Sequence, residues 1–95
     1  MAVLHHLFFG PERGELWSQF VATLAAPDVV ILLDDAARAA AWIATMQFTQ
    51  DVQLFIPDAE MAFCGIQAWP DGITRIADLD WWLLIETMPV LLEWN

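Results

Sequence analysis

The chain has 95 residues, and its 13 Asp and Glu against three Arg and no Lys give a formal charge of −10 at pH 7. This charge excludes binding of nucleic acid through a basic surface and membrane anchoring through a polybasic segment, because both need clustered cations. Apolar residues make up 59% of the chain, which excludes disorder. The length predicts one small domain spanning residues 1–95.

The apolar fraction exceeds what a small soluble domain needs, since such domains have about 45–50% apolar residues. A chain of about 100 residues hides only about 60–65% of its surface on folding. We therefore expect an apolar patch on the outside, and large patches usually bind partners. Apolar runs such as Val29–Leu33 and Trp81–Ile85 are far shorter than the roughly 20 residues of a membrane-spanning helix. We interpret the chain as a subunit that does not enter a membrane.

The N-terminus shows no cationic region followed by an apolar stretch and a cleavage site, so the sequence indicates no secretory signal. Cys64 is the single cysteine and cannot form an internal disulfide. We therefore expect a cytoplasmic protein.

Hydrophobic patterning predicts strands that alternate with helices. Residues Ala2–Phe9 read as a first strand closed by Gly10-Pro11, and helical spacing follows over Glu12–Ala26 until Pro27 stops it. The unbroken apolar run Val29–Leu33 predicts a strand buried on both faces, which is typical of a parallel sheet covered by helices.

The second half of the chain continues this alternation. A helix is predicted over Ala36–Met46, capped by Asp34 or Asp35, and a strand over Asp51–Ile56. A short helix follows from Pro57-Asp58 through Phe63 and is ended by Gly65. The last predicted elements are a turn at Trp69–Gly72, a strand over Ile73–Ile76 and a helix from Trp81 to about Met88 capped by Asp78 or Asp80. The tail Val90–Asn95 is too apolar for a loose end. We predict an α/β fold with a mostly parallel sheet of four to five strands and helices on both faces.

The two histidines, His5 and His6, are neighbours in the first predicted strand. Neighbouring strand residues point to opposite faces of a sheet, so the two rings cannot bind one metal ion without distortion. The sequence supplies no second cluster of Cys or His ligands. We therefore predict no metal site and a structural or interface role for both histidines.

Asp34 and Asp35 follow a predicted parallel strand, where ligands bind in open α/β sheets. Two carboxylates would repel a phosphate and no glycine-rich loop is present, so we predict a helix cap and no cofactor. Cys64 is the one candidate nucleophile or sulfur carrier. However, it lies near the end of a short predicted helix, and no Lys, Arg or His adjoins it to stabilise a thiolate. We assign no catalytic residue.

Tryptophans near the C-terminus are candidates for a partner surface. Trp81 and Trp82 lie about 100° apart on a helix, so one can face the sheet while the other faces a partner. We place Trp81 in the core and leave Trp82 and Trp94 open between core and interface. The candidate partner interface comprises Trp82, Leu91, Leu92 and Trp94.

The order of the predicted strands and helices along the chain resembles that of the TusB/DsrH sulfur-relay family of the DsrE/DsrF/DsrH-like superfamily. Leu4–Leu7 is similar to the family's Leu-His-x-Leu start, and Val30–Ala36 to its apolar strand ending in Asp-Gly. Val52–Ile66 resembles its third strand and the segment ending in Ala-Arg-Gly-Leu. The stretch from Ile76 to Trp94 resembles its Ile-Asp-Tyr-x-x-Phe-Val end with a terminal Trp. The resemblance covers nearly the whole chain and depends on order and spacing.

The resemblance implies a non-carrier structural subunit that joins TusC/DsrF-like and TusD/DsrE-like paralogues in a heterohexamer. Such a sulfurtransferase complex passes persulfide sulfur toward 2-thiouridine at the tRNA wobble position. The sulfur-carrying cysteine lies on the TusD/DsrE-like paralogue, and the matching region here, near Asp58 and Ala59, has no cysteine. Phe63 and Cys64 stand where the family has Ala-Arg, and Ala36 where it has Gly, so no role of that arginine is carried over. We expect no enzyme activity from the chain alone and no direct contact with nucleic acid.

Three other functions stay open. A DsrH-type subunit would serve sulfur oxidation, and the neighbouring proteins decide between the two pathways. An acidic chain could instead mimic nucleic acid, although its carboxylates lie mostly at turns and helix starts. A small thiol enzyme would use Cys64.

Overall fold

The computed structural model describes residues 2–48, 51–65 and 71–95. In this part of the chain, a sheet of five parallel strands has the order β4-β3-β2-β1-β5. The strands are β1 (Val3–Leu7), β2 (Val29–Leu32), β3 (Gln53–Pro57), β4 (Thr74–Ile76) and β5 (Val90–Trp94). The apolar tail therefore forms the fifth strand, which pairs with the first strand along one edge of the sheet.

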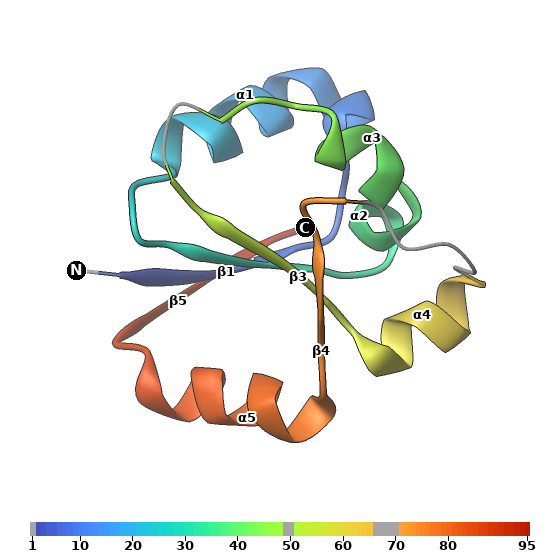
Figure 1. Cartoon of the computed structure of the whole chain (residues 1–95). Helices are drawn as coiled ribbons and strands as arrows, with labels where there is room; N and C mark the ends of the chain where they lie inside the picture. The colour runs from blue at the N-terminus through green and yellow to red at the C-terminus, as the bar shows by residue number, and fades with distance from the viewer. Residues whose placement is uncertain (1, 49–50, 66–70) are drawn as a thin grey trace.

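The connecting helices lie on both faces of the sheet, so the α/β fold expected from the sequence is confirmed. They are the 3-10 helix η1 (Pro11–Arg13) and the α-helices α1 (Gly14–Thr23), α2 (Asp35–Arg38), α3 (Ala40–Ala44), α4 (Asp58–Cys64) and α5 (Asp78–Thr87). Figure 1 shows α1 and α3 on one side of the sheet and α5 on the other. Within the described residues, no helix is long and apolar enough to cross a membrane.

Each face of the sheet has its own hydrophobic core. The core under α1 and α3 includes Leu7, Phe20, Val30, Leu32 and Ile43, and the core over α5 comprises Leu4, Val29, Ile31 and Leu33. The residues of β2 thus alternate between the two cores, and all four are buried. This confirms that the unbroken apolar run forms a strand covered on both sides.

The prediction of one continuous helix over Ala36–Met46 is wrong, because this segment forms two separate helices, α2 and α3, divided at Ala39. The backbone of Ala39 leaves the helical region, with φ −88° and ψ 10°. At this point the loop after β1 passes very close, since a Cβ added to Gly10 would lie 2.7 Å from the Ala39 methyl carbon. Alanine favours helix, so local propensity does not predict the break at Ala39. The break coincides with the close approach of the loop after β1.

Other helix boundaries also differ from the prediction, among them the end of α1 and the start of α5. Helix α1 ends at Thr23 rather than Ala26, because the N–H of Ala25 donates to the Asp28 carboxylate at 3.1 Å in a turn that leads into β2. Helix α5 begins at Asp78, with Ala77 at the N-cap position and no side-chain cap. Asp78 and Asp80 instead lie in its first turn, where negative charge is favourable.

The end of α4 follows the prediction, because Gly65 adopts the left-handed conformation with φ 69°. The predicted turn at Trp69–Gly72 lies partly outside the described residues, since residues 69 and 70 are not described.

Candidate functional site

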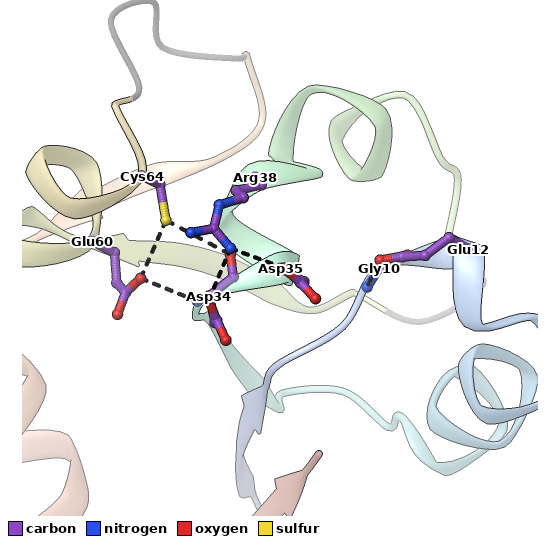
Figure 2. Close-up of polar contacts among 7 residues, drawn as sticks. All are labelled: Gly10, Glu12, Asp34, Asp35, Arg38, Glu60 and Cys64. Atoms are coloured by element: carbon purple, nitrogen blue, oxygen red, sulfur yellow. Dashed lines mark hydrogen bonds and ion pairs between the residues drawn. The ribbon is translucent and has the colours of Figure 1, made fainter.

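A polar cluster lies at the carboxyl ends of β2 and β3, where ligands bind in many open α/β sheets. It consists of Asp34, Asp35, Arg38, Glu60 and Cys64 (Figure 2). Asp34 precedes α2, Asp35 and Arg38 are the first and last residues of α2, and Glu60 and Cys64 belong to α4. The sheet therefore brings together the two candidate positions of the sequence analysis, the Asp34-Asp35 pair and Cys64.

The chain turns sharply at Asp34, between β2 and α2. The φ of 49° and ψ of −120° at Asp34 are rare for a residue with a Cβ. Its N–H donates to Oε2 of Glu60 at 3.1 Å, which links the end of β2 to α4. Asp34 occupies the N-cap position as predicted, but its side chain makes no capping hydrogen bond. The carboxylate instead accepts a hydrogen bond from Arg38.

Arg38 binds both neighbouring carboxylates through a single nitrogen. Its Nη1 donates to Oδ1 of Asp34 at 3.0 Å and to Oδ1 of Asp35 at 2.9 Å. The three side chains are each half exposed or more, so these ion pairs contribute little to stability. Arg38 is the cation of the polar cluster, and because it is paired with two carboxylates, the cluster has no unpaired positive charge to bind an anion.

Cys64 faces hydrogen-bond acceptors. Its Sγ lies 3.5 Å from Oε2 of Glu60 and 3.8 Å from the backbone oxygen of Asp34. Partial burial raises the pKa of the Cys64 thiol, and the hydrogen bond to Glu60 and the charge of that carboxylate raise it further. Arg38 acts in the opposite direction without reversing the shift. The thiol is therefore protonated near neutral pH, and this form is a poor nucleophile.

A second polar group is buried under α1. His5 and Asp28 have exposed fractions of 0% and 1%, and Nε2 of His5 lies 2.8 Å from Oδ2 of Asp28. The indole N–H of Trp94 donates to Nδ1 of His5 at 3.1 Å. Because an indole only donates, Nδ1 must accept, and the proton of the neutral ring lies on Nε2 and is donated to Asp28.

The Asp28 carboxylate receives two further hydrogen bonds from the backbone. The N–H of Val3 donates to Oδ1 at 3.0 Å, and the N–H of Ala25 donates to Oδ2. Burial alone would raise the pKa of Asp28, but the hydrogen bonds from His5 and from these two amides outweigh it and lower the pKa. Among the described residues, every buried side-chain nitrogen and oxygen has a partner. This group is therefore a satisfied structural network.

His6 points to the other face of the sheet, as the strand geometry predicts. Its Nε2 accepts a hydrogen bond from the indole N–H of Trp81 at 3.1 Å. Burial lowers the pKa of His6, and the charge of Glu93 offsets this only in part. Each histidine is therefore held by a different tryptophan, one on each side of the sheet.

The remaining candidates of the sequence analysis divide between interior and surface. Trp81 packs against the core over α5, as expected, and Trp82 is 60% exposed. Leu91 and Leu92 are exposed on the edge strand, whereas Trp94 is partly buried against His5 and Phe20. Three of the four interface candidates thus lie on the surface, and the fourth serves the interior network.

Sequence reasoning did not single out Arg38, Glu60 or Asp28. Arg38 follows Asp34 by four residues, and Glu60 precedes Cys64 by four, so helical spacing alone could have revealed both contacts. The Asp28 contact had no local signal, because His5 lies 23 residues away along the chain.

The described residues supply no evident ligand site. Residues 2–48, 51–65 and 71–95 contain no pocket, and none of their His, Cys, Asp and Glu side chains form a group of three or more that could hold a metal ion. Comparison of the sequence with models of known protein families finds no match, and comparison with curated proteins finds none either.

Proposed function

We propose that this chain is a non-carrier subunit of a cytoplasmic sulfur-relay complex of the TusB/DsrH kind. The assignment to sulfur relay rests on the resemblance of the sequence to that family. The small α/β domain with its parallel sheet agrees with the fold that the resemblance implies.

The exposure of large apolar side chains carries the subunit part of the proposal. Within residues 2–48, 51–65 and 71–95, the exposed large hydrophobic residues are Trp42, Phe63, Leu79, Trp82, Leu83, Leu91 and Leu92. Five of these seven lie between residues 79 and 92, in α5 and β5. Single exposed apolar residues are ordinary on a monomer, but a concentration in one segment is typical of a surface that binds another protein.

The surroundings of Cys64 support a non-carrier role. A cysteine that receives or passes on persulfide sulfur must react as a thiolate. Here burial, the hydrogen bond to Glu60 and the charge of Glu60 raise the pKa of the thiol. We therefore expect Cys64→Ser to retain sulfur transfer by the assembled complex. Loss of transfer by a Cys64→Ser complex that still assembles would contradict the non-carrier assignment.

The assembly itself is tested by native mass spectrometry of the chain purified alone and after co-expression with its genomic neighbours. We expect a heterohexamer that contains TusC/DsrF-like and TusD/DsrE-like paralogues. A monomer that ignores these neighbours would overturn the proposed function.

The pathway is tested separately from assembly. We propose 2-thiouridine formation at the tRNA wobble position, with sulfur oxidation by a DsrH-type complex as the alternative. Deletion of the gene should lower the 2-thiouridine content of tRNA, measured by mass spectrometry of digested nucleosides. Unchanged 2-thiouridine together with impaired sulfur oxidation would favour the alternative.

A further inference from the structure

Helix α5 carries apolar side chains along two opposite sides. The inner side packs against the core through Trp81, Leu84 and Ile85. The outer stripe consists of Leu79, Trp82 and Leu83, with exposed fractions of 83%, 60% and 57%. Because a helix turns by about 100° per residue, these two sets lie on opposite sides of α5. A surface helix needs one apolar stripe to pack on its own sheet, so the outer stripe is surplus to folding.

Acidic residues surround the outer stripe. Asp78 and Asp80 lie in the first turn of α5, about 100° to either side of Leu79, and Glu86 follows Leu83 along the outer side. Glu93 is paired in register with His6, which faces the α5 side of the sheet, so Glu93 projects to that side too. We call the carboxylates of Asp78, Asp80, Glu86 and Glu93 the acidic rim. No Lys, Arg or His occurs in the sequence after Arg75.

We propose that the outer stripe of α5 docks into an apolar groove of a partner protein whose edges carry Lys or Arg. Apolar side chains at positions i, i+3 and i+4 are the anchors with which helices enter such grooves. The acidic rim calls for opposite charge around the groove. Leu91, in register with the buried Leu4, lies on the same side of the sheet and extends the apolar surface toward β5. This inference rests on the proposed function and names the surface used.

Charge decides against two other occupants. A second copy of this chain would bring the same acidic rim against the first, and the net charge of −10 on each copy would oppose the approach. An anionic lipid surface would be repelled in the same way, because membrane-surface helices carry Lys and Arg on their polar side. Figure 1 shows α5 on the face of the sheet opposite α1 and α3, and the outer stripe on this helix is exposed to solvent.

The test compares Trp82→Gln with Trp42→Gln. Trp42 lies in α3 on the opposite face and is 51% exposed, so it is a matched control for the loss of an exposed indole. Each full-length variant is co-expressed with the proteins of the neighbouring genes, and affinity is measured by titration of the purified proteins. We expect Trp82→Gln to weaken binding about tenfold or more and Trp42→Gln to leave it unchanged. Thermal unfolding of each variant alone checks that both fold.

The acidic rim is tested by charge reversal. Asp80→Lys combined with Glu86→Lys should slow association at low salt, and added salt should reduce the difference from wild type. Glu15→Lys, an exposed position on α1, is the control for overall charge. Equal association rates of the double variant and the wild type would overturn the charge argument.

The outcomes separate this inference from the proposed function. A complex that forms and binds Trp82→Gln as tightly as wild type overturns the docking surface while the proposed function stands. Neighbouring proteins that do not bind the wild-type chain at all overturn both. A homodimer of the chain alone that Trp82→Gln dissociates also overturns the inference, because the occupant is then a second copy.

Discussion

The indole N–H of Trp94, near the end of the chain, donates a hydrogen bond to Nδ1 of His5, near its beginning, over 3.1 Å. His5 in turn reaches Asp28 through Nε2, so β5, β1 and the entry to β2 are joined inside one buried network. Both nitrogens of the ring are thereby committed. The terminal strand is tied to the sheet by a side-chain bond as well as by its backbone.

Replacement of Trp94 by Phe should therefore destabilise the protein. Phe keeps most of the apolar contact with Phe20 but removes the donor, which leaves Nδ1 of His5 buried and unsatisfied. We expect a loss of about 1–3 kcal/mol in the free energy of unfolding, measured by urea denaturation. Trp82→Phe, at an exposed position, should change it by less than about 0.5 kcal/mol. Equal effects at the two positions would contradict the role of the hydrogen bond.

Replacement of Asp28 by Asn should weaken the same network. An amide nitrogen in place of either oxygen would face a donor from Val3, Ala25 or His5, and we expect a loss of about 1.5–3 kcal/mol. Because the folded state lowers the pKa of Asp28 below its ordinary 3.8, this carboxylate stabilises the protein above about pH 4. That contribution disappears as pH falls through the lowered pKa.

Acid titration of the unfolding free energy measures this contribution directly. The decline of stability below about pH 4 should be shallower in Asp28→Asn than in wild type. Asp35→Asn, at an exposed carboxylate, provides the control and should resemble wild type. A decline as steep in Asp28→Asn as in wild type would count against the network.

The lowered pKa of His6 predicts that mild acidification destabilises the protein. Burial lowers the pKa of His6 below the ordinary value of 6.5, so around that pH the unfolded chain binds a proton that the folded chain does not. Stability therefore falls as pH decreases through about 6.5 and continues to fall until the folded pKa is reached. Urea denaturation at about pH 7.5 and about pH 5.5 measures the difference.

His6→Gln offers a matched comparison for this effect, because its amide oxygen can still accept the Trp81 indole N–H but does not titrate. We expect the stability difference between the two pH values to be smaller in His6→Gln than in wild type. An unchanged difference would show that another group causes the pH dependence.

Gly10→Ala should destabilise the contact between the loop after β1 and the break between α2 and α3. The new methyl carbon would lie 2.6 Å from Oε2 of Glu12 and 2.7 Å from the Ala39 methyl carbon. Glu12 can move, but the Ala39 backbone is held between two helices, so we expect a cost of about 1–3 kcal/mol. Addition of Ala39→Gly to Gly10→Ala should recover part of that cost. Strict additivity in this double-mutant cycle would rule out the contact.

Glu60→Gln should make Cys64 more reactive. Burial and the hydrogen bond to Glu60 raise the pKa of the thiol, and the charge of Glu60 raises it further; removal of that charge should increase the thiolate fraction at about pH 8. Alkylation by iodoacetamide, followed by mass spectrometry, should be severalfold faster than in wild type. Glu86→Gln, on α5, is the control for loss of one carboxylate and should not change the rate. Equal rates in Glu60→Gln and wild type would show that the charge of Glu60 does not contribute to the raised pKa of the thiol.

Local sequence determined the elements of this protein and the inside and outside of several of them. The run Val29–Leu33 has no polar residue, so a strand made from it is stable only when both faces are covered. The roughly 100° between Trp81 and Trp82 follows from helix geometry, and these residues do face the core and the surface. Such features depend on residues a few positions apart, which the sequence displays directly.

Tertiary structure alone decided the pairing of distant residues. Trp94 and His5 are separated by 89 residues, and the choice between core and interface for Trp94 depended on β5 lying beside β1. Cys64 likewise received the backbone oxygen of Asp34 as a neighbour because β2 and β3 are adjacent and parallel. Periodicity records which side of an element is apolar, but strand order is fixed by packing among all elements together. The networks around His5 and Cys64 therefore became visible only in the folded chain.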